Sequence, residues 1–300
     1  MTDRPAGLAP GLWGILATPF AGPEHDVDEA SLRREVALFR ELPATGLVAL
    51  GVFGEGAALD TAEQRRVLAV MTEEAHGLPV VAGLSARHTA PAVEQATAAA
   101  AAGGRLAGLM VQVNTASPEA LSGHLSAIHR ATGLGIVLQD YPVVSGVRIG
   151  PAQILATLAA CPFIVAVKSE APPTCAGIAD LTAGTDVPVF GGLGGVGLLD
   201  ELAAGAAGAM TGFSRPEALL AALRAWRAGR MAAAHQAYAR WLPLANFEAQ
   251  PGIGLALRKE ALRRRGIFAE AAVRPPAPPM PAALHRILTM HLDVYEGANA

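Results

Sequence analysis

The sequence has few cysteines, few aromatic residues and no excess of either charge. Cys161 and Cys175 are its 2 cysteines, too few for a disulfide framework or a cysteine-rich metal cluster. Acidic and basic residues are interspersed at a formal net charge of −3, and no basic stripe is visible, which argues against nucleic acid as a main partner. The histidines show no metal-site spacing with a carboxylate, so we expect neither a metal nor another cofactor.

Long uninterrupted apolar runs are also absent. Glycine, proline or arginine interrupts each candidate, which predicts that the chain has no membrane span. The segment Met1–Gly14 contains Pro5 and Pro10 and lacks the apolar core of a signal peptide. We therefore expect a soluble cytoplasmic protein. Its 300 residues, 52% hydrophobic and 16% charged, are enough to bury a sizeable core in one large α/β barrel or two smaller domains.

Short β-like runs alternate with helical stretches rich in alanine and leucine. The eight runs are Leu12–Pro19, Gly46–Val52, Pro79–Leu84, Ala107–Val113, Gly135–Gln139, Phe163–Lys168, Pro188–Gly191 and Ala207–Thr211. Several are apolar throughout, which is typical of a parallel sheet that helices cover on its outer face. The pattern predicts an α/β fold of the (β/α)8 TIM-barrel type, with a doubly wound sheet as the alternative.

The helical segments divide into two groups. Those between the strands include Asp28–Leu42, Thr61–His76, Ala90–Ala102 and Pro118–Thr132, with Asp60 or Thr61 and Ser117 at N-cap positions. Beyond Phe213 only helical patterns appear, at Pro216–Gly229, Met231–Trp241, Gly252–Gly266 and Ala282–His291. We therefore predict an N-terminal tail (1–11), a barrel (12–215) and a C-terminal helical extension packed on the barrel (216–300). His124 and His129 are expected to face solvent.

Lys168 is the only charged residue of the apolar run 163–168. A lysine at the end of a buried strand is costly to desolvate unless it is paired, and burial favours the neutral amine that attacks a ketone. In a barrel, catalytic groups lie at the C-terminal ends of strands and in the loops that follow them. Lys168 is therefore a candidate Schiff-base nucleophile, and the alternative is a lysine that only marks where the strand meets solvent.

Other polar residues follow the strands at the same end of the predicted barrel. Because side chains alternate along a strand, Glu170 shares a face with Lys168, and Tyr141 shares one with Gln139. The turn from Gly51 to Gly56 is either a plain tight connection or a loop whose backbone amides bind a carboxylate.

These motifs, in this order, resemble the dihydrodipicolinate synthase / N-acetylneuraminate lyase family of class I aldolases and dehydratases. The match runs from Leu12 to about Arg274. The segment Gly51-Val52-Phe53-Gly54-Glu55 stands where the family has the Gly-x-x-Gly-Glu loop that holds the substrate carboxylate, and Lys168 stands where it has its Schiff-base lysine. The resemblance implies a (β/α)8 barrel with a C-terminal helical extension, assembled as a homotetramer.

The sequence departs from the synthase pattern at four positions. Val52 and Phe53 replace two hydroxyl residues, Gln139 replaces the strand-five tyrosine, and Val144 replaces an arginine that binds a second carboxylate. The chain instead resembles a Gln-Asp-x-Pro branch associated with 2-keto-3-deoxy sugar acids. Glu170 and Tyr141 are then the candidate acid–base residues.

The expected activity is that of a Schiff-base lyase acting on a small-molecule 2-keto acid, either a sugar-acid dehydratase or an aldolase. Two alternatives stay open: a dihydrodipicolinate synthase that uses pyruvate and aspartate semialdehyde, and a non-catalytic relative that binds a keto or sugar acid. The expected substrate-binding residues are Gly51, Val52, Phe53, Gly54, Gln139, Asp140 and Gly192.

Overall fold

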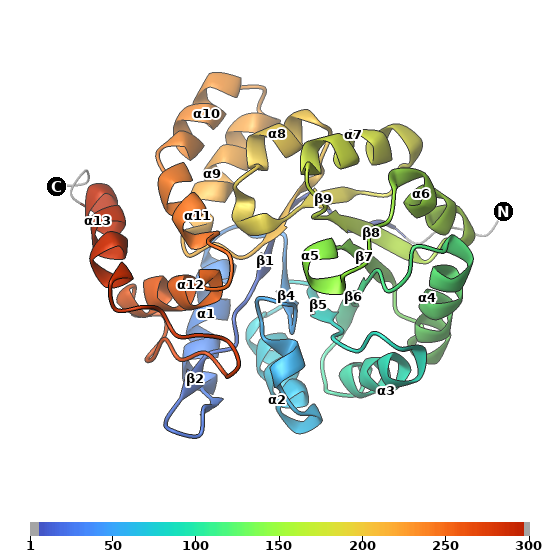
Figure 1. Cartoon of the computed structure of the whole chain (residues 1–300), viewed down its shortest axis with the longest axis horizontal. Helices are drawn as coiled ribbons and strands as arrows, with labels where there is room; N and C mark the ends of the chain where they lie inside the picture. The colour runs from blue at the N-terminus through green and yellow to red at the C-terminus, as the bar shows by residue number, and fades with distance from the viewer. Residues whose placement is uncertain (1–5, 297–300) are drawn as a thin grey trace.

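The computed structural model describes residues 6–296, and its centre is a closed barrel of eight parallel strands (Figure 1). Strand β1 pairs with β4 on one side and with β10 on the other, which closes the sheet. The (β/α)8 prediction is confirmed, and the doubly wound alternative is wrong. The strands are β1 (Gly11–Ile15), β4 (Gly46–Ala49), β5 (Val80–Gly83), β6 (Leu106–Gln112), β7 (Ile136–Asp140), β8 (Ile164–Ser169), β9 (Val189–Gly191) and β10 (Gly208–Thr211).

Helices surround this barrel and cover the outer face of the sheet (Figure 1). Two predicted N-caps are present: the Asp60 carboxylate accepts from the Glu63 backbone N–H within a capping box, and the Ser117 hydroxyl accepts from the Ala120 N–H. The helices that follow the eight strands include α1 (Glu29–Glu41), α2 (Thr61–Glu74), α3 (Thr89–Ala100), α4 (Pro118–Thr132), α6 (Pro151–Ala160), α7 (Thr174–Gly184), α8 (Leu198–Ala203) and α9 (Pro216–Arg227).

The loops after the strands contain short elements that the sequence patterns did not predict. They are a two-stranded hairpin of β2 (Phe20–Ala21) and β3 (Asp26–Val27), the 3₁₀ turns η1 (Gly56–Ala58) and η2 (Leu193–Gly195), and the single-turn helix α5 (Pro142–Ser145). All follow the C-terminal ends of strands. This end of the barrel therefore carries the most irregular backbone, where functional loops are expected.

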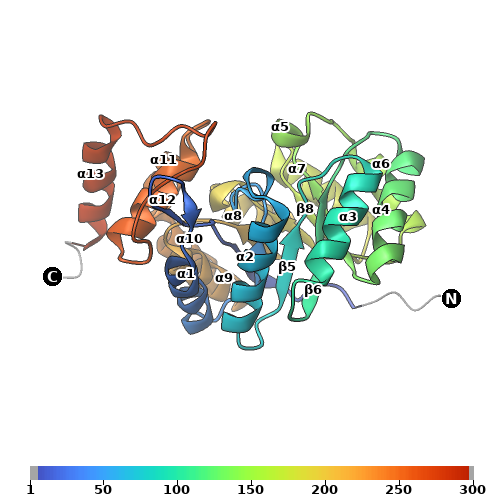
Figure 2. The same cartoon turned by 90° about the horizontal axis from the view of Figure 1, so that it is seen from below.

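Up to residue 296, the C-terminal extension contains four helices gathered on one side of the barrel, next to α1 and α9 (Figures 1 and 2). They are α10 (Met231–Ala239), α11 (Leu242–Glu248), α12 (Gly254–Arg264) and α13 (Leu284–Glu296). Helix α11 was not predicted. Its Pro243 lies in the first turn, where proline is compatible with a helix. The domain boundaries predicted from the sequence stay a proposal, and we move the boundary between barrel and extension.

Helix α9 packs on β1, so we propose that it completes the barrel and that the extension begins at α10.

The barrel interior is apolar over most of its length and becomes polar at one end. Trp13, Val48, Met110 and Phe190 belong to one buried cluster inside the sheet. Ala166 of β8 belongs to this cluster as well, and the alternation of the strand turns Lys168 to the same side, two residues nearer the C-terminal end. The fold thus places Lys168 above an apolar interior.

His124 and His129 of α4 do not face solvent, so that prediction is wrong. His124 is buried, with Nδ1 3.0 Å from the Thr89 hydroxyl of α3, and this burial lowers the pKa of the imidazole. His129 is half-buried, stacks on Phe163 at 4.2 Å between ring centroids and donates from Nδ1 to the Leu134 carbonyl at 2.8 Å. Both rings fill space beside neighbouring elements of the barrel.

No helix within residues 6–296 is both long enough and apolar enough to span a membrane.

Candidate functional site

The centre of the site is an ion pair between Lys168 and Glu170 at the C-terminal end of β8. Lys168 Nζ lies 3.1 Å from Glu170 Oε2, and each side chain is only 5% exposed. A buried ammonium and carboxylate are tolerated only as a hydrogen-bonded pair, because removing one partner leaves a charge without compensation. The sequence-predicted lysine and carboxylate are therefore in direct contact.

Three further groups fix the position of the Glu170 carboxylate. Gln139 donates from Nε2 to Oε2 at 2.7 Å, and the Leu193 backbone N–H donates to Oε1 at 3.2 Å. Gly192 leaves room for the carboxylate, since a Cβ at that position would lie 2.2 Å from Oε1. Gln139 and Gly192, predicted to bind substrate, thus both contact Glu170, and through it they set the geometry beside Lys168.

Asp140 and Tyr141, the two residues after Gln139, face different surroundings. With Ser169, Asp140 lines a separate cavity of about 280 Å³ that α6 and α7 also border. Burial, and secondarily the charge of Glu170, raise the pKa of Asp140 to about 6. The half-buried Tyr141 has its pKa raised by desolvation and by Glu170. The charge of Glu170 therefore acts on both side chains, while Asp140 lines the cavity beside α6 and α7.

The predicted glycine loop follows β4 and is tightly packed. Leu50 and Glu55 adopt left-handed backbone conformations at its two ends, with φ of 57° and 52°. The Thr18 hydroxyl donates to the Gly54 carbonyl at 2.7 Å, and a Cβ on Gly54 would lie 3.0 Å from the Leu16 carbonyl oxygen. Gly51 precedes this turn on the same loop. The backbone is thus held in one conformation at the place predicted for the substrate carboxylate.

Val52 and Phe53 occupy the middle of the loop and differ in burial. Val52 is 41% exposed, whereas Phe53 packs on the apolar cluster inside the barrel and covers Gly212. Neither side chain offers a hydroxyl, so any polar contact from these two residues to a substrate comes from their backbone amides.

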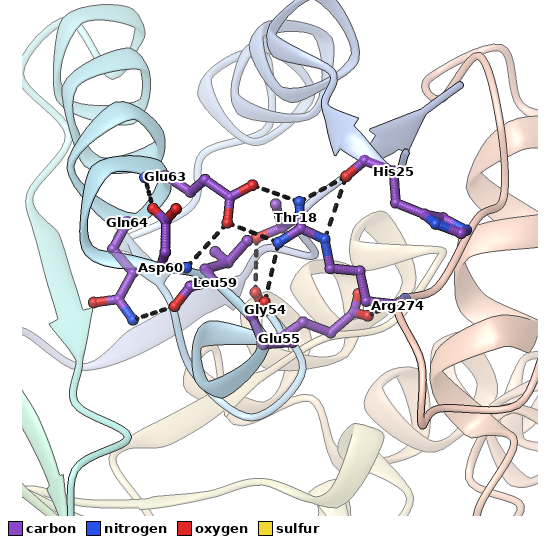
Figure 3. Close-up of polar contacts among 10 residues, drawn as sticks. Thr18, His25, Gly54, Glu55, Leu59, Asp60, Glu63, Gln64 and Arg274 are labelled. Atoms are coloured by element: carbon purple, nitrogen blue, oxygen red, sulfur yellow. Dashed lines mark hydrogen bonds and ion pairs between the residues drawn. The ribbon is translucent and has the colours of Figure 1, made fainter. Parts of the chain in front are cut away.

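Two basic residues of the C-terminal extension, Lys259 and Arg274, fasten this loop, and no local sequence pattern indicated them. Figure 3 shows the contacts of Arg274. Lys259 of α12 is fully buried; its Nζ forms an ion pair with the Glu55 carboxylate and donates to the Ala272 carbonyl at 2.8 Å. The Arg274 backbone N–H donates to Glu55 Oε1 at 3.0 Å. The Arg274 guanidinium pairs with Glu63 of α2. Glu55 is thus the point where the extension grips the loop.

Arg258, the residue before Lys259, is a further residue that the sequence reasoning missed. Its guanidinium lies over the Phe53 ring at 5.1 Å and its Nε is 3.6 Å from Oε2 of the buried Glu248. Desolvation lowers the pKa of Arg258, and the charges of Glu248, Tyr141 and Glu170 oppose that effect. An arginine from the extension therefore belongs to the same electrostatic environment as Glu170.

Glu201 of α8 is the fourth unpredicted residue, behind the strand that leads to Gly192. Its Oε1 accepts a hydrogen bond from the Thr174 hydroxyl at 2.8 Å, while its Oε2 is buried without a hydrogen-bond partner among the described residues. Burial, followed by the charge of Glu170, raises the pKa of Glu201 to about 7. No set of three or more His, Cys, Asp or Glu side chains within the described part of the chain is grouped to hold a metal ion.

Comparison with known proteins identifies relatives over nearly the whole chain. The profile of the Dihydrodipicolinate synthetase family matches residues 9–291. A 4-hydroxy-tetrahydrodipicolinate synthase of Mycolicibacterium paratuberculosis is 31% identical over 296 residues, covering 97% of this chain and 96% of that protein. An L-2-keto-3-deoxyarabonate dehydratase of Azospirillum brasilense is 29% identical over 288 residues, covering 93% and 92%.

Solved structures show the same fold. Dihydrodipicolinate synthase from Rhodopseudomonas palustris superposes with a TM-score of 0.89 at 28% identity, over 97% of this chain and 99% of that one. YagE, a prophage protein of the dihydrodipicolinic acid synthase family from E. coli K12 solved in complex with pyruvate, superposes with a TM-score of 0.86. At 21% identity, over 95% of this chain and 98% of that one, the second likeness concerns the fold alone.

Proposed function

Because the chain belongs to the Dihydrodipicolinate synthetase family of class I lyases, in which a lysine forms a Schiff base with a 2-keto acid, we propose that Lys168 is that lysine. We further propose that the substrate is a 2-keto-3-deoxy sugar acid. The enzyme class follows from the family, and the residue roles and the substrate are the proposal.

The observation that carries the proposal is the 3.1 Å contact between Lys168 Nζ and Glu170 Oε2. An ammonium has no lone pair and cannot attack a carbonyl carbon. Transfer of one proton from Nζ to the Glu170 carboxylate leaves a neutral amine, which attacks C2 of the keto acid; loss of water then gives the imine. When the imine nitrogen is protonated, the returned carboxylate beside it is its counter-ion.

Dehydration then needs one proton moved and one hydroxide released. The iminium acidifies the C3 protons, and we assign Glu170 as the base that removes one of them. The electron pair left at C3 forms the C3–C4 double bond as the C4 hydroxyl departs with a proton returned from Glu170, so that water is the leaving group. Tyr141 is the second candidate donor for this proton. Hydrolysis of the imine releases the product and regenerates Lys168.

The substitutions around Lys168 support a sugar acid over aspartate semialdehyde. Gln139 holds Glu170 through its side-chain amide, and Val52 and Phe53 offer no hydroxyl for a proton relay. The Azospirillum relative, named as an L-2-keto-3-deoxyarabonate dehydratase, is similar over 93% of this chain. The relatives named as synthases keep the synthase reaction as the second candidate.

The decisive experiment is reductive trapping of the imine. Lys168 and Lys259 are the only lysines in the sequence, so peptide mapping after incubation with pyruvate and borohydride has two side-chain sites to distinguish. We expect the reduced adduct on Lys168 and its loss from that position in Lys168→Ala. An adduct on Lys259 alone, or none, contradicts the proposal and favours a non-catalytic binding protein.

Substrate class is tested separately with a panel of 2-keto-3-deoxy acids. Loss of water without pyruvate release indicates a dehydratase, and pyruvate release indicates an aldolase. Turnover of pyruvate with aspartate semialdehyde at a higher kcat/KM than any sugar acid would overturn the substrate assignment. We also propose a cytoplasmic homotetramer, on the family resemblance; light scattering of the purified protein measures its mass.

A further inference from the structure

We propose that Arg258 is a specificity-determining residue, whose guanidinium donates hydrogen bonds to oxygen atoms on the distal carbons of the bound keto acid, beyond C3. This inference rests on the proposed function, because it takes the keto group to be attached at Lys168.

The Arg258 side chain comes from outside the barrel and reaches the site between two loops. It leaves α12 of the C-terminal extension and lies over the Phe53 ring of the loop after β4, 5.1 Å from its centroid. Its Nη2 also lies 2.4 Å from where a Cβ of Gly194 would be. Gly194, at φ +71°, therefore leaves the space that the guanidinium fills.

The guanidinium is held in place and keeps donors free. The Arg258 side chain is 13% exposed, and its ion pair with Glu248 spans 3.6 Å, longer than a hydrogen bond. Both Glu248 oxygens instead accept hydrogen bonds from Ser214, one from the backbone N–H and one from the hydroxyl. Arg258 Nε, buried, has no hydrogen-bond partner within residues 6–296. Glu248 thus provides a negative charge that positions the Arg258 guanidinium, without accepting hydrogen bonds from its N–H groups.

Arg258 and Glu170 contact consecutive residues of the loop after β9. The Leu193 backbone N–H donates to Glu170 Oε1 at 3.2 Å, and the Arg258 guanidinium lies against Gly194. The charges of Tyr141 and Glu170 also act on Arg258. In the proposed reaction Glu170 acts at C3 and C4, so a cation against the next residue of this loop is placed for the carbons that follow. A guanidinium presents a planar fork of N–H donors and stays charged at every pH of interest.

The chemistry that this fork recognises is an oxygen acceptor on a chain of at least four carbons. Hydroxyls of a sugar acid and a terminal carboxylate of a sugar diacid both satisfy it, the carboxylate in a bidentate manner. Pyruvate ends at C3 and has no atom to offer. We therefore expect a selective effect: Arg258 contributes to the binding of long substrates and not to that of pyruvate.

The test measures how Arg258→Met changes the binding of long 2-keto-3-deoxy acids and the binding of pyruvate. We expect the half-saturating concentration of five- and six-carbon 2-keto-3-deoxy acids to rise about 10- to 100-fold, which is the usual effect of losing a charged hydrogen bond. The pyruvate concentration needed for half-maximal borohydride trapping should change less than about 3-fold by the same reasoning. Acids that end in a hydroxyl and in a carboxylate are compared, and the larger loss identifies the natural terminus.

Two further variants separate recognition from folding. Arg263→Met, on the same helix with its side chain 43% exposed, is the matched control and should leave both measurements unchanged. Arg258→Lys keeps the positive charge but loses the planar fork of donors, so it should show a smaller loss of the same selective kind for long substrates.

Three results would overturn the inference. Equal effects on pyruvate and on long acids would show that Arg258 only supports the fold, and no effect on either would show that it does not contact substrate. If the wild-type protein traps no pyruvate, the proposed function fails, and the Arg258 inference fails with it.

Discussion

Lys168 and Glu170 form a buried ion pair whose two charges cancel. The other partners of the Glu170 carboxylate come from elsewhere in the barrel, one from the end of a strand and one from the loop after another strand. The acid is held by Gln139 at the end of β7 and by the Leu193 backbone after β9. Such a pair costs desolvation energy that packing alone would not require. Its position at the C-terminal end of the barrel is the physical reason to propose a chemical role for it.

Replacing Glu170 by glutamine should separate imine formation from proton transfer. The amide keeps the shape of the carboxylate but cannot take a proton, so we expect kcat on a 2-keto-3-deoxy acid to fall by about 10²- to 10⁴-fold. Trapping of pyruvate by borohydride should persist at a lower rate. Glu73→Gln, at a side chain 67% exposed, is the control and should behave as wild type. Unchanged kcat in Glu170→Gln would remove Glu170 from the mechanism.

Gly192→Ala should displace the Glu170 carboxylate without changing its chemistry. The new Cβ would lie 2.2 Å from Oε1, so the acid must move away from its Leu193 and Lys168 contacts. Misplacing an acid–base group by about 1 Å is expected to lower kcat roughly 100-fold. The control is Gly123→Ala on α4, where a Cβ meets nothing within 4 Å and helix propensity should raise stability by about 0.5–1 kcal/mol. Equal kcat values in the two variants would contradict the placement of Glu170.

Lys259→Met should destabilise the protein through the carboxylate that it leaves behind. Glu55 would be buried without its cation, and breaking such a pair typically costs about 3–5 kcal/mol. Adding Glu55→Gln should recover part of this loss, because the remaining group is then neutral. Urea unfolding of the two single variants and the double variant gives the coupling energy. Additive effects would show that Lys259 and Glu55 are not coupled.

Glu201→Gln should flatten the pH dependence of stability. Burial raises the pKa of Glu201 from its ordinary value of 4.5 to about 7, so the folded state binds a proton that the unfolded state releases. Its contribution to stability is therefore present at low pH and is lost as the pH rises from about 4.5 to 7. Glutamine carries no charge and keeps the Thr174 hydrogen bond.

We expect the Tm of Glu201→Gln to match that of the wild type near pH 4.5 and to exceed it by several degrees at pH 8. Thermal unfolding across this range measures the difference. A Tm difference that is constant with pH would show that Glu201 does not titrate in this window.

The repeating part of the fold was predictable because it leaves a local signal. Each strand is a short apolar run, and Asp60 and Ser117 mark helix starts by residue type alone. Alternation along β8 correctly joined Lys168 to Glu170. Hydrophobic alternation alone did not show that Asp140 lines the cavity beside α6 and α7, because Gln139 and Asp140 are both polar and either could face inward.

The unpredicted residues share a different property: their partners are distant in the sequence. The Arg274 backbone contacts Glu55 across 219 residues, and Arg258 meets Phe53 only after the extension has packed on the barrel. A pair of this kind has no spacing that a single sequence reveals. The prediction that the histidines of α4 face solvent was wrong for a similar reason. His124 is buried against α3, and the position of α3 beside α4 depends on the closed barrel.

The contacts of Lys259 and Arg274 with Glu55 also imply an order of folding during synthesis of the chain. Strand β4 and the glycine loop leave the ribosome early, but the Lys259 ammonium and the Arg274 backbone N–H that fix Glu55 are more than 200 residues behind. Until they emerge, the loop lacks its fastening and Glu55 lacks its counter-ion. A nascent chain that already contains all eight barrel strands still lacks the contacts that fix the loop after β4. If this loop binds substrate as we propose, the site is completed only when the segment from Lys259 to Arg274 has been synthesised.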